Sequence, residues 1–203
     1  MFGAEVVSFA ARTPEALLLI DPLLPEQPAG ELFALLDGEA SRVGRIAILT
    51  TMTYHVRSSE ALWERYRHEH TVSIHRHPAA RKRLTASSTA FAEIAPEEPL
   101  PGGAVAHPIG RPRRFEQPLH LPSHDAVVFG DAVVGVDGEL RVWAAQPVDE
   151  RVRTFYRERF CPTLEPLVKL GAGRMLMTHG ASVLSHGSEA LQQALEAEPW
   201  SHR

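Results

Sequence analysis

The chain has 203 residues, of which 44% are hydrophobic and 23% are charged, close to the average of globular proteins. A chain of this length can bury a sizeable core without disulfide bonds or structural metal ions. The composition therefore excludes a disordered chain, a collagen and a disulfide scaffold. The formal net charge of −4 disfavours a dedicated nucleic-acid-binding protein, because such proteins neutralise phosphates with an excess of basic residues.

Cysteine usage and the apolar stretches bear on the compartment. The single cysteine, Cys161, excludes an internal disulfide and fits a reducing compartment. Apolar stretches such as residues 16–20 are far shorter than the roughly 20 residues of a membrane helix. Residues 1–5 show no basic region followed by an apolar one. We therefore expect a cytoplasmic protein that does not bind a membrane.

The first half of the chain predicts strands and helices in mixed order. Short apolar runs predict strands over residues 5–10, 15–20, 45–49 and 71–74. Apolar residues at helical spacing predict a helix over residues 30–39 and another after Ser58 and Ser59, which can cap it. A short basic helix is expected over residues 78–84.

The second half predicts a hairpin, two further strands and a mostly helical C-terminal part. Strands are predicted near residues 104–106 and at residues 126–129, 133–136, 140–143 and 174–177. Asp137-Gly138 is a strong signal for a hairpin turn. Helices are predicted over residues 149–160, 162–170 and 188–197. Residues 96–122 hold seven of the 16 prolines, so we expect an irregular stretch that shapes a pocket.

Most of the predicted strands end in polar residues. This pattern is typical of a layered α/β domain with a functional site at the strand ends. No linker divides the chain, so a single domain over residues 1–203 is expected.

Four apolar segments end in polar residues, in this order along the chain: Leu18-Leu19-Ile20-Asp21-Pro22, Ile46-Ala47-Ile48-Leu49-Thr50, Ala126-Val127-Val128-Phe129-Gly130-Asp131 and Arg174-Met175-Leu176-Met177-Thr178-His179-Gly180. Together they resemble segments of the metallo-β-lactamase superfamily. The first resembles the second strand of that fold with its aspartate, and the second resembles the strand before the HxHxDH motif. The third resembles the strand whose Gly-Asp supplies a bridging metal ligand, and the fourth resembles the late strand that ends in a His-Gly ligand. The resemblance covers nearly the whole chain and implies an α/β fold, the four-layer αββα sandwich.

The chain departs from the superfamily pattern at the HxHxDH motif. Without a gap, Thr51 and Thr53 stand at the first two histidines and His55 stands at the aspartate. A shift of one residue instead places His55 at the last histidine and Tyr54 at the aspartate. The third histidine of the first metal subsite is expected near residues 110–114, where the chain has none. The resemblance therefore implies a degenerate site that has lost the three histidines of one subsite.

The resemblance leaves His55, Asp131 and His179 as candidate metal ligands. Three protein ligands plus a water are typical of catalytic zinc sites, and the metal lowers the pKa of that water to about 7. We expect one zinc, iron or manganese ion, or none. Each residue also has a structural explanation: Gly-Asp is an ordinary turn, His179 can be a buried histidine with its partners satisfied, and His55 can cap a loop.

Several polar residues are candidates for binding the substrate. The hydroxyls of Thr51 and Thr53 can hold a water or substrate in the place of the lost metal, and Tyr54 and Arg111 can orient an anionic one. A solvated face is the simpler explanation for the arginine clusters at residues 76–83 and 111–114. Four histidines over residues 68–77 look like a metal cluster, but their strand and helix positions favour structural roles.

Three functions remain open. The first is a hydrolase of ester, amide or phosphoester bonds with at most one metal. The alternative is a non-catalytic protein that binds a small ligand or a protein partner in the former active-site cleft. A weaker possibility is metal-free chemistry with His55 or His179 as general base. We expect a small-molecule ligand or substrate, and a homo-oligomer remains open.

Overall fold

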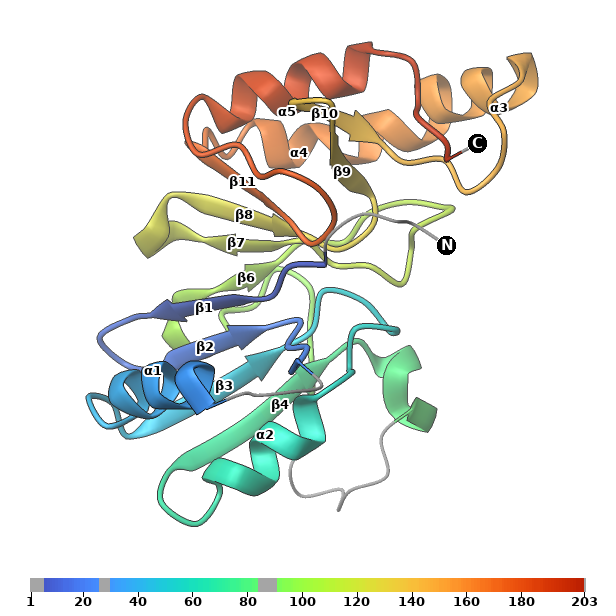
Figure 1. Cartoon of the computed structure of the whole chain (residues 1–203). Helices are drawn as coiled ribbons and strands as arrows, with labels where there is room; N and C mark the ends of the chain where they lie inside the picture. The colour runs from blue at the N-terminus through green and yellow to red at the C-terminus, as the bar shows by residue number, and fades with distance from the viewer. Residues whose placement is uncertain (1–5, 26–29, 84–90, 203) are drawn as a thin grey trace.

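The computed structural model describes residues 6–25, 30–83 and 91–202. Two β-sheets face each other in the middle of the molecule, and helices cover the outer face of each sheet (Figure 1). The result is the expected four-layer αββα sandwich. None of the helices in these residues is long and apolar enough to cross a membrane.

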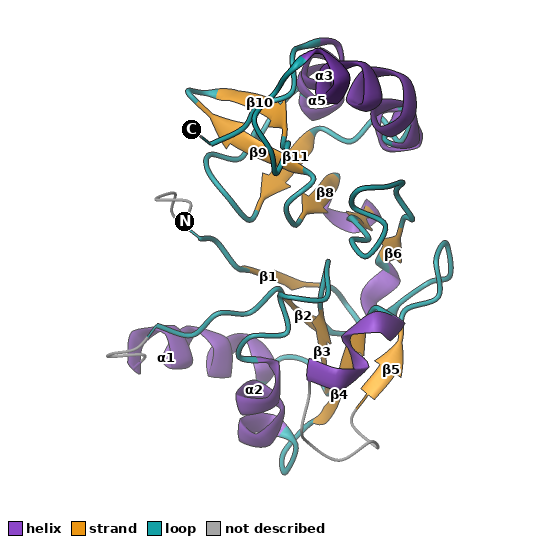
Figure 2. Cartoon of the chain, turned by 90° about the vertical axis from the view of Figure 1, so that its right-hand side faces the viewer, coloured by secondary structure: helices purple, strands orange, loops and turns teal. Residues whose placement is uncertain are grey.

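The first sheet has the strand order β1-β2-β3-β4-β5. Its strands β2 to β5 are parallel, and β1 pairs with β2 in the antiparallel direction. Helices α1 and α2 lie on its outer side (Figure 2). The elements are β1 (Phe9–Arg12), β2 (Leu17–Ile20), α1 (Gly30–Ala40), β3 (Arg45–Leu49), α2 (Ser59–Tyr66), β4 (Thr71–Arg76), the 3₁₀ helix Pro78–Arg83 and β5 (Phe91–Glu93).

The second sheet has the order β11-β8-β7-β6, and a β9-β10 hairpin lies beside it. Its strands are β6 (Val105–Ala106), β7 (Leu119–Leu121), β8 (Ala126–Phe129) and β11 (Arg174–Met177), and the hairpin is β9 (Val133–Val136) with β10 (Glu139–Val142). The helices are α3 (Glu150–Phe155), a π-helical turn Tyr156–Phe160, α4 (Glu165–Val168), α5 (Gly187–Glu196) and 3₁₀ turns at Pro101–Gly103, Pro122–His124 and Cys161–Thr163.

Alternation of side chains along the central strands explains why their sequences are apolar throughout. In β2, Leu17 and Leu19 pack with α1 and α2, whereas Leu18 and Ile20 pack between the sheets. In β8, Val128 faces the first sheet, and Phe129 lies in the core beneath the C-terminal helices. Both faces of these strands are therefore buried, which selects large apolar residues at every position.

The strand register brings four polar segments to one edge of the molecule. Ile20 of β2 pairs with Leu49 of β3, and Phe129 of β8 pairs with Met177 of β11, both in the parallel direction. The polar residues that follow these four strands therefore leave the sheets at the same end.

Most of the predicted elements are present within one to three residues of the expected bounds. In the stretch 96–122, the strand expected near residues 104–106 is present as β6, whereas β7 was not expected. The two strands pair antiparallel and extend the second sheet through β8. The expected helix over residues 149–160 changes from α-helix to π-helix at Tyr156. Strand β5, too short to give a pattern, was not predicted, and residue 84 of the expected basic helix lies outside the described residues.

Candidate metal centre

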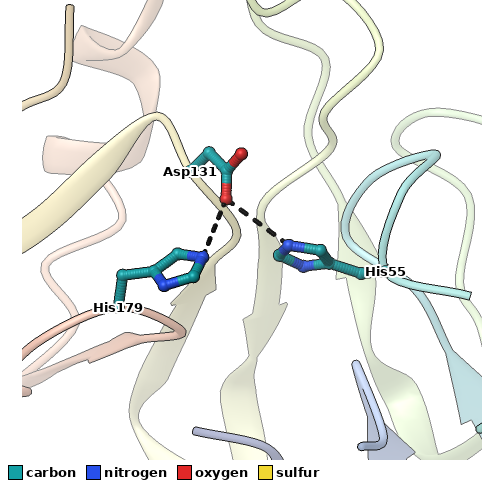
Figure 3. A group of neighbouring side chains, drawn as sticks. All are labelled: His55, Asp131 and His179. Carbon is teal, nitrogen blue, oxygen red and sulfur yellow. Dashed lines mark ion pairs between the residues drawn. The ribbon is translucent and has the colours of Figure 1, made fainter. Parts of the chain in front are cut away.

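His55, Asp131 and His179 meet at the strand ends (Figure 3). Oδ1 of Asp131 lies 3.4 Å from Nε2 of His55 and 3.2 Å from Nε2 of His179. Each residue offers one ligand atom within 4.8 Å of the others, and it is the one such group of three found in the described part of the chain. Ligands about 2.0–2.1 Å from a tetrahedral zinc lie roughly 3.4 Å from each other, so the two contact distances fit a shared metal.

Asp21 fixes the ring of His55. The Nδ1 atom of His55 lies 2.8 Å from Oδ2 of Asp21, and both side chains are buried. With Nδ1–H donating to this carboxylate, Nε2 is the nitrogen that faces Asp131. A carboxylate behind a metal-binding imidazole sets its tautomer and orientation in this way.

Asp21 is itself held firmly at the end of β2. It is fully buried, its φ of 47° lies in the left-handed region, and its Oδ1 accepts a 2.7 Å hydrogen bond from the backbone N–H of Thr51. The hydroxyl of Thr51 donates to Oδ2 at 2.5 Å. The hydroxyl of Thr178, which donates to the carbonyl oxygen of Phe129 at 2.6 Å, lies 3.4 Å from the same Oδ2. Hydrogen bonds from Thr51, at the end of β3, therefore hold this carboxylate.

Glu116 positions the backbone that carries Asp131. This fully buried carboxylate accepts hydrogen bonds from the N–H groups of Gly130, Asp131 and Ala132 at 3.0–3.1 Å. Gly130 is required because a Cβ there would lie 2.7 Å from the hydroxyl oxygen of Thr51. The Gly-Asp turn is therefore fixed by a side chain from the proline-rich stretch.

His179 is placed by close backbone contact with the β9 strand. Its carbonyl oxygen accepts a 3.0 Å hydrogen bond from the N–H of Gly135. The next residue, Gly180, has a φ of 78°, and a Cβ there would lie 1.9 Å from the carbonyl oxygen of Gly135. Only glycine fits this position, which turns the chain so that the imidazole faces Asp131.

The second oxygen of Asp131 faces an arginine. Nη1 of Arg113 lies 3.7 Å from Oδ2, and the guanidinium stacks on Trp143 with 4.1 Å between Cζ and the ring centroid. Arg113 lies within residues 110–114, where the superfamily pattern predicts the third histidine. The half-buried guanidinium of Arg57 interacts electrostatically with both Asp21 and Asp131.

These contacts shift the ionisation of the site in opposite directions. Burial lowers the pKa of His55, but the neighbouring carboxylates of Asp131 and Asp21 outweigh it and raise the pKa to about 9. Burial raises the pKa of Asp131, but its contacts with His179 and His55 hold that pKa well below its usual range. Burial and the nearby charge of Asp131 raise the pKa of Glu116 to about 7.

Solved structures of known proteins share this architecture. A metallo-β-lactamase from Pontibacter korlensis superposes with a TM-score of 0.64 and 14% identity over 94% of this chain and 87% of that chain. An archaeal metallo-β-lactamase superfamily protein from Sulfolobus tokodaii gives a TM-score of 0.66 and 13% identity over 94% and 79%. The chain has the metallo-β-lactamase fold. No protein-family model and no curated protein matches the sequence.

Other proteins with this fold are described with iron. A protein solved in a di-iron-bound form gives a TM-score of 0.60 and 19% identity, covering 94% of each chain. A chemotaxis sensor described as a peroxy di-iron species gives a TM-score of 0.64 and 12% identity over 97% of this chain and 88% of that chain. At these identities the likeness shows the fold alone, and the chemistry has to be argued from the residues.

The residues expected to bind substrate lie in different surroundings within this metallo-β-lactamase fold. Thr51 is fully buried with its hydroxyl on Asp21, and Thr53 is buried as well. Tyr54 is 61% exposed, and Arg111 is exposed. The histidines considered as a separate cluster are apart from the site: His75 lies on β4 against Ser73, and the others follow α2 or β4.

Sequence analysis missed part of this site. It named Asp21 only as the aspartate that follows a predicted strand, and it did not single out Glu116. Arg113 entered merely as one member of an arginine cluster. A buried acid in an otherwise polar loop has no local signature, because its partners are backbone groups from a distant turn.

Proposed function

We propose that the protein is a hydrolase with one metal ion held by His55, Asp131 and His179. The observation that carries the proposal is the carboxylate oxygen that two imidazole nitrogens approach at 3.4 and 3.2 Å. The carboxylate behind His55 supports it, because a metal-binding histidine commonly has such a partner. Zinc, iron and manganese remain the candidate ions, and the di-iron neighbours favour iron as one of them.

A metal in this site supplies Lewis acidity and lowers the pKa of a bound water to about 7. The residues of this chain then have separate roles. Asp21 keeps Nδ1 of His55 protonated so that Nε2 faces the centre, and Glu116 holds the Asp131 backbone. Tyr54 and Arg111, at the surface, are proposed to contact the substrate, while the two threonines support Asp21 or a bound water.

One arrangement favours the second candidate, a non-catalytic protein that binds a ligand in the same cleft. Asp131 already pairs with both histidines and with Arg113, so its charge is balanced by residues of the chain itself. In that case the site is stable with no metal, and the ligand takes the place of a substrate.

Metal content, thermal stability and turnover together test the proposal. Protein stripped of metal is titrated with zinc, iron(II) and manganese(II), and the melting temperature is followed. A site filled at 100 times its dissociation constant adds about 2.7 kcal/mol to the unfolding free energy. We expect one ion per chain and hydrolysis of at least one substrate among esters, thioesters, lactones and phosphodiesters.

The variant Asp131→Ala is expected to lose both the metal and the turnover. His68→Ala is the matched control, because this exposed histidine lies on the surface after α2. Stoichiometric metal without turnover would support the ligand-binding protein instead. Turnover that persists in metal-free protein would overturn the proposal in favour of general-base chemistry.

A further inference from the structure

Two arginines of the site carry buried nitrogen atoms without a hydrogen-bond acceptor among the described residues. In Arg113, whose side chain is 13% exposed, these atoms are Nε and Nη2. In Arg57 the atom is Nη1. Burying a charged donor without an acceptor is costly, and a bound water, ion or ligand can supply the missing acceptor.

Both guanidinium groups act on the same carboxylate. Arg113 contacts Oδ2 of Asp131 at 3.7 Å, which is too long for a hydrogen bond, and Arg57 interacts with Asp131 through its charge. The guanidinium of Arg113 therefore faces Oδ2 of Asp131, the oxygen opposite the one that the two histidines approach, without a hydrogen bond to it.

The backbone and stacking contacts hold both arginines in place. Arg113 stacks on the ring of Trp143, which fixes the plane of the guanidinium. Arg57 has a φ of 24°, in a region that residues other than glycine rarely adopt, two positions after His55. A strained residue next to a candidate site is consistent with a positioned side chain.

We infer that Arg57 and Arg113 bind an oxyanion, the phosphate or carboxylate group of the substrate or ligand, beside Asp131. The flat guanidinium fork matches the oxygens of both groups, and a partly buried setting strengthens the contact. The positive charges of Arg57 and Arg113 attract an anion, and the carboxylates of Asp21 and Asp131 offset part of that charge. The inference rests on the proposed function for the choice of site and adds the class of ligand.

Binding to metal-free protein tests this independently of catalysis. Protein freed of metal and dialysed against a non-coordinating buffer is titrated calorimetrically with phenyl phosphate, benzoate and, as neutral control, phenol. We expect saturable binding of phenyl phosphate or benzoate, weakened by added salt, and no binding of phenol. The anion that binds with the higher affinity identifies the preferred group, phosphate or carboxylate.

Variants of each arginine locate the binding. Arg113→Gln and Arg57→Gln should each weaken binding about tenfold or more, because a hydrogen bond to a charged group is lost. Arg114→Gln, an exposed neighbour of Arg113, should change it less than twofold. Arg113→Lys keeps the charge without the fork and should lie between these results. Melting temperatures confirm that each variant is folded.

The outcomes separate this inference from the proposed function. Anion binding that depends on both arginines supports the inference, even if the protein takes up no metal. Absence of anion binding to the folded wild-type protein overturns it, even if zinc binds to His55, Asp131 and His179. Equal binding to wild type, Arg113→Gln and Arg57→Gln also overturns it, because the anion then binds elsewhere.

Discussion

The two oxygens of Asp131 face different chemistry. Oδ1 meets two imidazole nitrogens, one of them backed by the buried Asp21, and this imidazole side has the donors of a metal centre. Oδ2 meets the guanidinium of Arg113, and this guanidinium side has charge but no metal ligand. The difference teaches that a carboxylate without a histidine on one side need not be unbalanced, because a fixed side-chain cation takes up its charge there.

Replacing Glu116 should displace Asp131 and so disturb both the imidazole side and the guanidinium side. We expect this change to have the largest effect. Glu116→Ala leaves three buried N–H groups without an acceptor, each worth about 1–3 kcal/mol, so we expect a loss of about 3 kcal/mol or more. Glu116→Gln keeps one carbonyl acceptor and should lose about 1 kcal/mol. Urea unfolding measures both, with the exposed Glu139→Ala as control.

The Glu116 result also bears on the geometry of the metal. If Glu116→Ala does not fold, Glu116→Gln still tests the role, because a displaced Asp131 weakens zinc binding in a folded protein. A Glu116→Ala variant within about 0.5 kcal/mol of wild type would contradict the positioning role, since surface substitutions fall in that range.

Replacing Asp21 should weaken the imidazole side. Asp21→Asn removes the charge behind His55, and changes of such outer partners typically lower metal affinity about 10–100-fold. Competition with a chelating dye measures the zinc affinity. Asp137→Asn, in the β9-β10 turn, is the control because asparagine also tolerates its φ of 51°.

The same Asp21 variant sharpens the comparison of the two sides. Binding of phenyl phosphate to Asp21→Asn should not weaken, because Arg57 and Arg113 are unchanged and the variant removes a negative charge that acts on Arg57. Unchanged zinc affinity would contradict the orienting role of Asp21.

The smallest effect is expected for His75, which lies outside both sides of the site. It concerns the dependence of protein stability on pH. Burial, and then the charge of Arg45, lower the pKa of His75 on β4 in the folded protein. The unfolded chain therefore takes up the proton first, and stability falls as the pH drops below about 6.5. His75→Gln should make this fall shallower in urea midpoints measured from pH 8 to 5.5.

Exposed His68→Gln is the control for the pH series and should leave the curve unchanged. Burial lowers the pKa of His77, His107 and His120 as well, so part of the fall remains in the His75 variant. A curve for His75→Gln that coincides with wild type would contradict the assignment to His75.

The sequence by itself determined the layers of this protein. Runs such as Leu17–Ile20 and Ala126–Phe129 are apolar at every position, which only a strand buried on both faces requires. The polar residues after them, including Asp21, Asp131 and His179, marked the edge where a site forms. Strands β5 and β7 are too short to show a pattern in the sequence. Their strand conformation depends on pairing with the neighbouring strands.

Only the tertiary structure decided which residues of the site contact each other. Glu116 and Arg113 come from the proline-rich stretch, whose path no periodicity predicts, and they contact a turn that follows a different strand. The sequence showed Asp21 only as the residue after a strand, and the parallel pairing of β2 with β3 placed it behind His55. Hydrogen bonds and charge pairs of this kind join residues 14 to 34 positions apart in the chain, so local sequence carries no trace of them.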